Sequence, residues 1–493
     1  MTTAQAQQPQ KKPMTAITPT RADDFPGWYQ AVVKASDMAE NSPTRGAMII
    51  KPYGWAIWEN MQAIFDGWLK DYGVQNTAFP LLIPVSFLAR EAEHVEGFAK
   101  ECAVVTHHRL ESDGKGGLIP APAAKLEEPY VVRPTSETII GDAMSRWIQS
   151  YRDLPLQLNQ WGNVMRWEMR TRLFLRTSEF FWHEGHNAFE DKPGAEKDCM
   201  TVLDMYERFF TDYLAFDGFK GVKTPDERFP GADETYAFEA MMQDGKALQA
   251  ATTHNLGTNF AKSFNIKYQD RNGQEQFVHT TSWAFSTRTI GGLIMIHGDD
   301  DGMIMPPRIA PEQAVILPIV KDDASAGDVI EFCRSIAATL KKQGFRVKVD
   351  ARDMRTPDKM WEAVKKGVPV RIEVGAREME QGQLTFVRRD LGRESKQTLG
   401  VDAFVQAFPK VLDDIHDSLL ARSRRLRDDN TADGASVADV NDFFAAGRTG
   451  FVKVPVALLD DPALEPVKTE HSLSTRVMPF ADEGRKVLLA KSY

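Results

Sequence analysis

Arginines, carboxylates and aromatic side chains alternate in the segment NVMRWEMRTRLFLRTSEFFWHEGHNAF, residues 163–189. If residues 163–168 and 176–186 form two β-strands around a short loop, their period of two places Arg166 and Glu168 on one face. The same period gathers six side chains of the second strand on that face: Arg176, Ser178, Phe180, Trp182, Glu184 and His186. One guanidinium group can bind two phosphate oxygens at once, and the face of an aromatic ring can stack on a purine. The pattern therefore predicts a nucleotide lying on a β-sheet.

The alternatives to this interpretation explain less. A salt-bridged hairpin would account for the charges of the segment but not for the aromatic residues that alternate with them. The sequence contains neither G-x-x-x-x-G-K-[ST] nor G-x-G-x-x-G, so neither a P-loop nor a dinucleotide-binding fingerprint offers another nucleotide site. The glycine-rich stretch DGKGGLIP, residues 113–120, is more typical of a loop tip.

The composition is that of a globular protein, because 42% of the 493 residues are hydrophobic and 26% are charged. At ~150 residues per domain the length predicts roughly three domains. No apolar run approaches the ~18 residues of a membrane helix. Residues 1–20, expected to be a disordered tail, lack the apolar region of a secretory signal. We therefore expect a cytoplasmic protein that does not associate with a membrane.

Residues 54–73 form the clearest predicted helix, because apolar residues recur at three- and four-residue steps and a glycine follows them. The next segment, TAFPLLIP at 77–84, resembles a short strand. Pro80 within it cannot donate to a β-ladder, which places the strand at an edge or an interface. An apolar helix face beside an edge strand suggests a dimer surface.

Residues 314–406 have the pattern of an α/β domain, since strand-like segments such as 314–320 and 368–376 alternate with helical stretches such as 326–344. Between Arg334 and Arg371, basic residues outnumber acidic ones. The net charge of −9 argues against a general coating of nucleic acid, but a local basic face is compatible with binding RNA. A solvated helix face explains the same charges equally well.

At this point several motifs resemble one family. R-x-E at 166–168, followed by a loop and R-x-x-x-F at 176–180, is similar to motif 2 of the class II aminoacyl-tRNA synthetases. Residues 54–84 resemble motif 1, and GGLIMIHGDDDGMIMPPRIAP at 291–311, which contains Arg308, resembles motif 3. Three further stretches narrow the resemblance to the prolyl-tRNA synthetases: RPTSE at 133–137, FFWHEGH at 180–186 and SWAFSTRTIGG at 282–292.

The resemblance runs from Phe25 to Tyr493 and implies a function. Such an enzyme activates L-proline with ATP, releases pyrophosphate and transfers proline to the terminal adenosine of tRNA(Pro). The match is to the archaeal/eukaryotic-like type, because the roughly 95 residues between motifs 2 and 3 leave no room for a large editing domain. The resemblance also implies that the protein forms a homodimer and that it uses ATP together with Mg²⁺.

A role is implied for each matching residue. Arg166 would hold the α-phosphate and the prolyl carboxylate, Arg176 and Arg308 would hold the β- and γ-phosphates, and Phe180 would stack under adenine. The residues matching nucleotide contacts are Arg166, Glu168, Arg176, Phe180, Gln249, Thr252, Ser286, Arg288 and Arg308. The family usually has Thr where Ser286 stands. The residues matching the proline pocket are Thr135, Glu137, Arg166, Trp182, Glu184, His186 and His254.

The chemistry of the substrates agrees with these assignments. The secondary ammonium of proline needs one or two carboxylates and its ring needs a small apolar wall, which Glu137 or Glu184 with Trp182 would provide. A carboxylate already attacks as an anion, so no protein base is required. Catalysis would consist of positioning and of charge stabilisation as pyrophosphate leaves. Taken alone, His254 would more often be a structural or capping histidine.

The resemblance assigns residues 311–409 to an anticodon-binding domain, with Arg371 and Glu373 as candidates for base contacts. Strand alternation could equally make Arg371 part of a strand-end salt bridge. The last domain of this family often carries a four-cysteine zinc site. The chain has three cysteines, none after Cys333 and none in a C-x-x-C pair, so we expect no zinc.

These expectations combine into one architecture of the α/β class. Residues 1–20 would be a tail, 21–310 an α+β catalytic domain with an antiparallel sheet flanked by helices, 311–409 an α/β anticodon-binding domain, and 410–493 a small α+β domain without its zinc ligands. The final run RKVLLAKSY alternates like a strand, and the family's terminal tyrosine, here Tyr493, is directed toward the active site. A non-charging paralogue would lose the motif arginines or the anticodon domain, and a ligase acting on another acceptor would lack residues 314–407.

Overall fold

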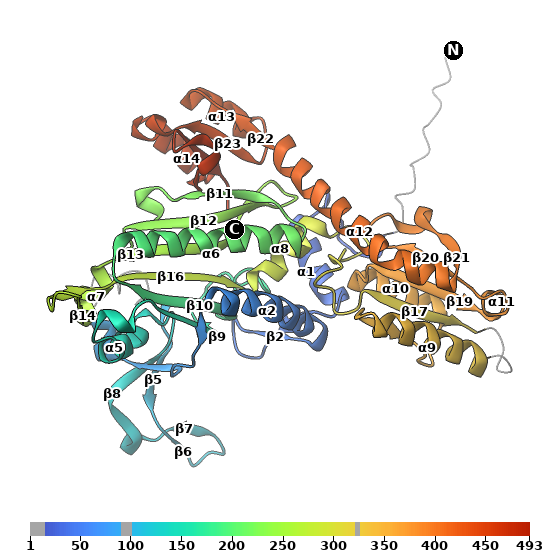
Figure 1. Ribbon diagram of the computed structural model, residues 1–493, viewed down its shortest axis with the longest axis horizontal. Coiled ribbons are helices and arrows are strands. Elements are labelled where there is room, and N and C mark those ends of the chain that lie inside the picture. Colours follow the sequence, from blue (N-terminus) through green and yellow to red (C-terminus); the bar gives the residue numbers. More distant parts are fainter. Residues whose placement is uncertain (1–14, 90–100, 321–325) are drawn as a thin grey trace.

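The computed structural model describes residues 15–89, 101–320 and 326–493. An antiparallel sheet lies at its centre, an α/β part lies to the right and a small terminal part lies above (Figure 1). The central sheet has eight strands in the order β25-β11-β12-β13-β16-β10-β9-β3, and only the short β3–β9 pair is parallel. Its strands are β3 (Gln75–Asn76), β9 (Leu156–Met165), β10 (Glu179–Phe189), β11 (Gly218–Val222), β12 (Glu234–Met241), β13 (Ala247–Gly257), β16 (His279–Ser286) and β25 (Met478–Pro479).

The main core lies between this sheet and the helices α1 (Phe25–Ala35), α2 (Pro52–Tyr72), α6 (Lys192–Asp212) and α8 (Arg288–His297). The apolar stripe predicted for residues 54–73 is the buried side of α2, which ends at Gly73 with a φ of +100°. Phe65 on this stripe stacks on Tyr206 of α6 with 5.2 Å between ring centroids. The stripe therefore packs against the chain's own core, which corrects the expectation that it faces a second copy.

The opposite face of the sheet is covered at one end by α5 (Glu137–Trp147) and α7 (Asn259–Phe264), which enclose a second apolar cluster. The remaining small pairs of the catalytic part are β1 (Ala39–Asn41) with β2 (Met48–Ile50) and β14 (Lys267–Gln269) with β15 (Glu275–Phe277). At the other end of this face, none of the described helices lies over β10, β13 and β16, and a pocket opens there.

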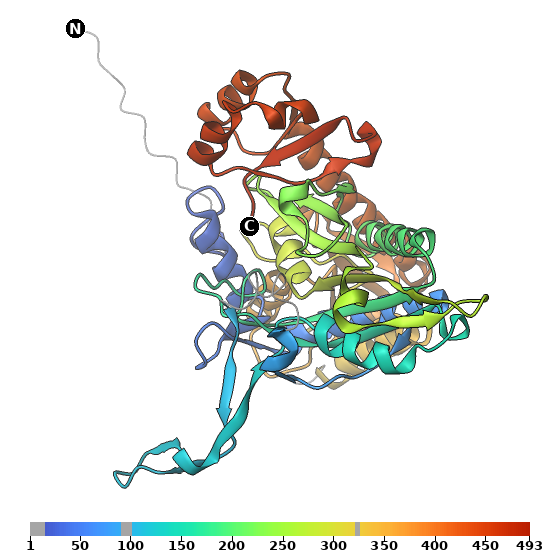
Figure 2. The same cartoon turned by 90° about the vertical axis from the view of Figure 1, so that its left-hand side faces the viewer.

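A narrow arm projects from the catalytic part (Figure 2). Its root is a sheet in the order β4-β8-β5, built from β4 (Leu82–Pro84), β8 (Lys125–Val132) and β5 (Val104–His107), and its tip is the pair β6 (Leu110–Ser112) and β7 (Leu118–Pro120). The short helix α3 (Val85–Ala89) follows β4. Pro80 lies just before β4, and β4 is an edge strand of its sheet.

The α/β part is a five-stranded sheet in the order β18-β17-β19-β20-β21, in which β17 is parallel to both neighbours. Its strands are β17 (Ala314–Ile319), β18 (Val347–Val349), β19 (Val370–Gly375), β20 (Gln383–Arg388) and β21 (Gln397–Gly400). Its helices are α9 (Ala326–Lys342), α10 (Thr356–Lys366) and α11 (Ala376–Glu380). A fourth helix, α12 (Val401–Asp429), buries Phe404 and Leu419 in the same core, so the chain crosses the expected boundary at 409–410 inside a helix.

The last part joins β22 (Thr431–Asp433), β23 (Phe451–Pro455), β24 (Ser474–Thr475) and β26 (Lys486–Ala490) into a sheet beside α13 (Val437–Ala445) and α14 (Leu464–His471). Between β24 and β26, the two residues of β25 pair with β11 and extend the catalytic sheet. The chain end also returns to that sheet, because Tyr493 N donates to the carbonyl of Ala247 at 3.1 Å. The terminal part is therefore bonded to the catalytic part both through β25 and through the chain end.

The expected N-terminal tail needs correction at its inner end, while residues 1–14 lie outside the described residues. Ile17 is 2% exposed in the main core, and its N–H donates to the carbonyl of Asp300 at 2.9 Å. Ala16 N donates to the carboxylate of Asp301 at 3.0 Å. Burial of the Ile17 side chain thus orders this segment, although the polar residues around it suggested disorder. Within the described ranges, no helix combines the length and the apolarity needed to cross a membrane.

Candidate active site

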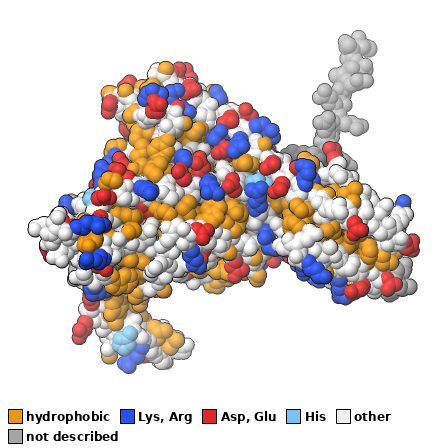
Figure 3. All heavy atoms as spheres, in the orientation of Figure 1, with side chains coloured by type: hydrophobic (Ala, Val, Ile, Leu, Met, Phe, Trp, Pro, Cys, Tyr) orange, Lys and Arg blue, Asp and Glu red, His pale blue; other side chains and the backbone are white. Residues whose placement is uncertain are grey.

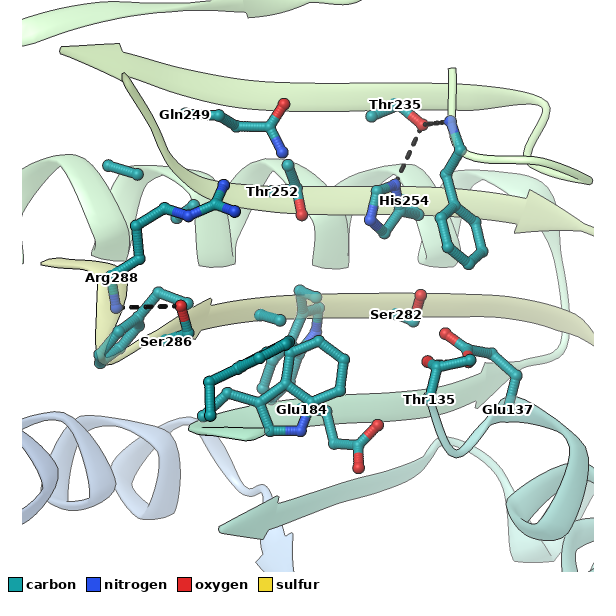
Figure 4. Close-up of a pocket in the computed structure, with 18 of the residues that line it drawn as sticks. Thr135, Glu137, Glu184, Thr235, Gln249, Thr252, His254, Ser282, Ser286 and Arg288 are labelled. Carbon is teal, nitrogen blue, oxygen red and sulfur yellow. Dashed lines mark hydrogen bonds between the residues drawn. The ribbon is translucent and has the colours of Figure 1, made fainter. Parts of the chain in front are cut away.

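A pocket of about 230 Å³ lies on the uncovered face of the central sheet, over β10, β13 and β16 (Figure 4). The strand registers explain which side chains meet there. Glu184 of β10 is paired with Ala284 of β16, which is paired with Thr252 of β13. The predicted site residues that line the pocket are Thr135, Glu137, Arg166, Phe180, Trp182, Glu184, His186, Gln249, Thr252, His254, Ser286 and Arg288.

One end of the pocket is cationic. Arg288 is the first residue of α8, where its N–H donates to Ser286 Oγ at 3.2 Å and its Nε donates to the carbonyl of Leu175 at 3.1 Å. Burial, together with the nearby charges of Arg176 and Arg166, lowers the pKa of Arg288 to about 10. Guanidinium groups held so close together repel one another, so this end of the pocket is suited to a polyanion.

Arg166 lies between the cationic end and the carboxylates. Its Nε donates to the carbonyl of Pro134 at 3.0 Å, and its guanidinium lies 5.5 Å from the ring of Phe180 and 5.4 Å from that of Trp182. Burial lowers the pKa of Arg166, and the nearby charges of Glu137 and Glu184 offset part of that shift. The arginine can therefore contact an anionic group on one side and remain neutralised on the other.

Both oxygens of the Glu184 carboxylate contact protein groups. One oxygen accepts from Ser136 Oγ at 2.6 Å and from Gln160 Nε2 at 2.9 Å, and the other lies 3.0 Å from His186 Nε2. Burial disfavours the charged form of both partners, but the hydrogen bond and attraction between them outweigh this effect. The pKa of Glu184 therefore lies below its ordinary value and that of His186 above it. Glu184 and His186 therefore form a buried ion pair.

Glu137, at the start of α5, has a simpler environment than Glu184. One oxygen of its carboxylate accepts a hydrogen bond from Thr135 Oγ1, and the side chain lines the pocket while only 7% of the residue is exposed. A carboxylate offers about four acceptor positions. Glu137 therefore keeps acceptor capacity for a ligand that Glu184 has already spent on Ser136, Gln160 and His186.

The far wall of the pocket contains residues that the motifs did not indicate. Phe229 lies against the ring of His254 at 4.6 Å between centroids, and Thr235 Oγ1 is 3.0 Å from His254 Nδ1. Glu227 and Arg228 come from the same connection between β11 and β12. This connection, TPDERFPGADE, pairs an aromatic residue with charges, but it has no periodic pattern that would have singled it out.

Three predicted nucleotide residues lie outside the pocket lining. Glu168 and Arg176 belong to the loop between β9 and β10, with 3.8 Å between Arg176 Nη1 and Glu168 Oε2. Arg308 is a correction: its Nη1 donates to the carbonyl of Asp212 at 2.6 Å and its Nη2 lies 3.1 Å from Asp413 of α12. The reason is that the chain leaves α8 toward the α/β part, so Arg308 lies in the contact between the two parts, while Arg288 lines the pocket.

A second, larger cavity of about 500 Å³ lies in the α/β part beside α10, β19 and β20. Arg371, Arg389 and Trp361 line it, and Asp301 of the catalytic part closes one side. Arg371 also forms the salt bridge that strand alternation suggested, with 3.1 Å between its Nη2 and Glu373 Oε1. Much of the basic surplus of residues 334–371 is paired locally, for example Arg352 with Asp350 and Glu362. Lys and Arg side chains gather over α9 on the face shown in Figure 3.

Metal chemistry has no protein-built centre in the part of the chain that the structure describes. No three His, Cys, Asp or Glu side chains gather there in a way that would hold an ion. Cys199 and Cys333 are buried and Cys102 is partly exposed, and all three are free thiols. Magnesium commonly binds through substrate phosphates and water with only one or two carboxylates, so this observation is compatible with Mg²⁺ carried by ATP.

Comparison with known proteins agrees with this geometry. Residues 123–297 match the family model described as tRNA synthetase class II core domain (G, H, P, S and T), and residues 313–410 match that of an anticodon binding domain. A proline--tRNA ligase of Bdellovibrio bacteriovorus is 49% identical over 97% of this chain and 99% of its own length. A proline--tRNA ligase 2 of Anaeromyxobacter dehalogenans is 50% identical over 97% of this chain and 99% of its own length.

These matches cover the catalytic sheet, its pocket and the α/β part that follows, and they confirm the predicted fold class. Because about half of the residues are identical over almost the whole of both chains, the matches to these relatives extend over every domain of the structure. The chain belongs to the prolyl-tRNA synthetases, a family of class II aminoacyl-tRNA synthetases.

Proposed function

We propose that this chain activates L-proline with ATP in the pocket over β10, β13 and β16, releases pyrophosphate, and transfers proline to the 3′-terminal adenosine of tRNA(Pro). The observation that carries the proposal is one pocket with a cationic end, at Arg288, a carboxylate end, at Glu137, and Arg166 between them. The relatives named proline--tRNA ligase support the same reaction. A charging reaction that serves translation also supports a cytoplasmic location.

The test is ATP–pyrophosphate exchange with a panel of amino acids, followed by charging of tRNA. We expect proline to support exchange and to become attached to tRNA(Pro). Exchange that depends on another amino acid, or exchange without charging, would contradict the assignment.

The arginines would act by position and charge. Arg166 would contact the α-phosphate and the prolyl carboxylate, Arg288 would contact the nucleotide, and Arg176 would approach the outer phosphates from the mouth of the pocket. Phe180 would offer its ring to adenine, with Gln249, Thr252 and Ser286 as polar neighbours. The prolyl carboxylate attacks the α-phosphorus and the bond to pyrophosphate breaks, so fixed cations stabilise the charge that develops. Mg²⁺ bound with ATP would neutralise charge on the leaving pyrophosphate.

For proline recognition we favour Glu137 over Glu184 as the acceptor for the ammonium. The ion pair with His186 already neutralises Glu184, whereas Glu137 faces the pocket and, among the described residues, accepts a side-chain hydrogen bond from the Thr135 hydroxyl alone. Trp182, with the His254 and Phe229 pair, would enclose the apolar ring.

Two features support finer points of the proposal. Residues 190–278, all described by the structure, form strands and helices of the catalytic part itself, which supports the type without an inserted editing domain. In the α/β part, the cavity beside Arg371 supports this region as the anticodon site. Because Arg371 and Glu373 are bonded to each other, they would meet a base as one unit that offers both a donor and an acceptor.

We further propose a homodimer whose interface includes the edge strand β4 and the residues just before it. Leu81 is 43% exposed beside the edge strand β4, although its backbone carbonyl is bonded to Arg133 N. Changing Leu81 to Asp is expected to yield monomers with weak proline activation, because a charge cannot be buried in an apolar contact. Sedimentation and exchange kinetics measure the two effects. Leu391→Asp, at a residue 55% exposed in the α/β part, is the matched control, and fully active Leu81→Asp monomers would refute the proposal.

Deleting Tyr493 is expected to weaken amino-acid activation while leaving the melting temperature and tRNA affinity nearly unchanged. The Tyr493 hydroxyl donates to Asp244, and its ring lies 4.8 Å from Lys246 Nζ and 5.8 Å from the guanidinium of Arg172. Arg172 belongs to the loop that also carries Arg166 and Arg176, so the terminal ring braces the nucleotide end of the pocket. Exchange kinetics of the deletion and of Tyr493→Phe, which keeps the ring, separate this role from simple capping; unchanged kinetics would contradict it.

We propose that the enzyme folds without zinc. In the part after α12, apolar residues such as Phe444, Val454 and Val487 form a core of their own. Metal analysis of the purified protein is expected to show no stoichiometric zinc. Zinc that survives dialysis against a chelator would contradict the proposal. Because this part of the chain has no cysteine, such zinc would require an unusual site of His and carboxylate ligands.

A further inference from the structure

A threonine hydroxyl is buried beside the proline end of the pocket without a hydrogen-bond partner among the described residues. Thr280 lies on β16, two residues before Ser282, and is 5% exposed. Its Oγ1 contacts neither a donor nor an acceptor there. Buried hydroxyls almost always have a partner, from the protein or from ordered water. An ordered water beside Thr280 would supply the missing partner.

A small cavity of about 20 Å³ lies next to this hydroxyl, behind the active-site pocket. Glu137 and His186 line both the cavity and the pocket, so the two spaces are separated by the same side chains that are expected to meet proline. Ile140, Met144 and Leu256 supply the apolar part of its wall.

The size of the cavity decides what it holds. One water needs about 10–15 Å³ measured in this way and two to four polar partners. The cavity has room for one water, and Thr280, Glu137 and His186 are among the polar residues that line it. Purely apolar cavities of this kind stay dry, which distinguishes this one from a packing defect.

The carboxylate of Glu137 has room for the second bond of such a water. Thr135 Oγ1 is the side-chain donor to Glu137 Oε2, and a carboxylate accepts about four hydrogen bonds. We propose that the cavity binds one water molecule that accepts a hydrogen bond from Thr280 Oγ1 and donates one to Glu137. Thr280 is then a positioning residue, which acts through this water on the carboxylate that receives the ammonium of proline. The positioning role rests on the proposed function, whereas the water itself does not.

The test compares the full-length protein with Thr280→Val, which replaces the hydroxyl by a methyl group of similar shape, and with Thr280→Ser, which keeps the hydroxyl. A high-resolution crystal structure of the unchanged protein is expected to show the water, and that of Thr280→Val is expected to lack it. In pyrophosphate exchange, the KM for proline should rise about 2- to 12-fold in Thr280→Val, the effect of one hydrogen bond. The kcat and the KM for ATP should stay unchanged, and Thr280→Ser should resemble the unchanged protein.

The outcomes separate the two parts of the proposal. A dry cavity in the unchanged protein would overturn the water site. An unchanged KM for proline in Thr280→Val, or an equal rise in Thr280→Val and Thr280→Ser, would overturn the positioning role, since the second result indicates packing rather than hydrogen bonding. If the unchanged protein shows no proline-dependent exchange, the proposed function fails and the positioning role with it, while the density in the cavity still tests the water.

Discussion

Replacing Arg166 by alanine is expected to lower proline-dependent ATP–pyrophosphate exchange by about 10²–10³-fold, the usual effect of removing one preorganised donor at a developing charge. The guanidinium lies over Phe180 and Trp182 between the carboxylates and the cationic end of the pocket, where an α-phosphate would lie. Its Nε donates to the carbonyl of Pro134, and its side chain lies outside the buried apolar clusters, so the fold should survive.

The control for this prediction is Arg170→Ala. Arg170 belongs to the same loop between β9 and β10 but is exposed and does not line the pocket. We expect its exchange rate to be close to that of the unchanged protein. Circular dichroism and thermal melting check that both variants are folded, and near-normal exchange in Arg166→Ala would refute the nucleotide-site assignment.

The largest effect on stability is expected from Glu239→Gln. Glu239 of β12 is 0% exposed; its carboxylate accepts from Lys223 Nζ at 3.1 Å and from Arg476 Nη2 at 2.9 Å. Arg476 belongs to the terminal part, so this buried triad joins that part to the catalytic sheet. Removing the negative charge leaves two buried cations unpaired, and breaking a buried pair in this way costs about 3–5 kcal/mol of unfolding free energy.

The pH dependence of this triad gives a second measurement. Burial alone would raise the pKa of Glu239, but Arg476 and Lys223 hold it below its ordinary value of 4.5. A carboxyl with a lowered folded pKa stabilises the fold above its unfolded pKa and loses that contribution as the pH falls through the folded value. Urea unfolding from pH 7 downward should therefore show a loss of stability below about pH 4.5 that Glu239→Gln lacks.

The matched control is the surface pair Arg485 and Glu483, whose side chains are 74% and 72% exposed. Exposed pairs contribute about 0–1 kcal/mol, so Glu483→Gln should leave the unfolding midpoint nearly unchanged. If Glu239→Gln has an equally small effect, the triad does not hold the two parts together.

Strand alternation predicted the part of the pocket that β10 supplies, whereas residues such as Glu137, Thr252 and Arg288 were assigned through the family resemblance. Phe180, Trp182 and Glu184 share a face because a strand alternates, and the register with β16 brings Ser286 to the same face. Arg308 could not be placed in this way. Its motif assignment depended on where the chain goes after α8, and that path is fixed by contacts with Asp212 and Asp413, distant in sequence.

Other features were outside the reach of sequence patterns for similar reasons. The connection that carries Phe229 has no periodicity, and β25 has only two residues, so neither gives a signal above its surroundings. The stripe on α2 was recognised correctly as apolar, but a stripe does not reveal whether the covering surface belongs to the same chain or to a second copy. Burial of Phe65 against Tyr206 settles this for the stripe.

The return of the chain end to the catalytic sheet has a consequence for biosynthesis. β25 and the Tyr493–Ala247 hydrogen bond add late-made residues to strands made more than 200 residues earlier. While the ribosome still covers residues 478–493, the edge of β11 and the carbonyl of Ala247 lack these partners. We therefore expect the catalytic sheet to be completed only after these residues have left the ribosome, so that a product terminated before residue 478 carries an exposed β-edge that chaperones and proteases can recognise.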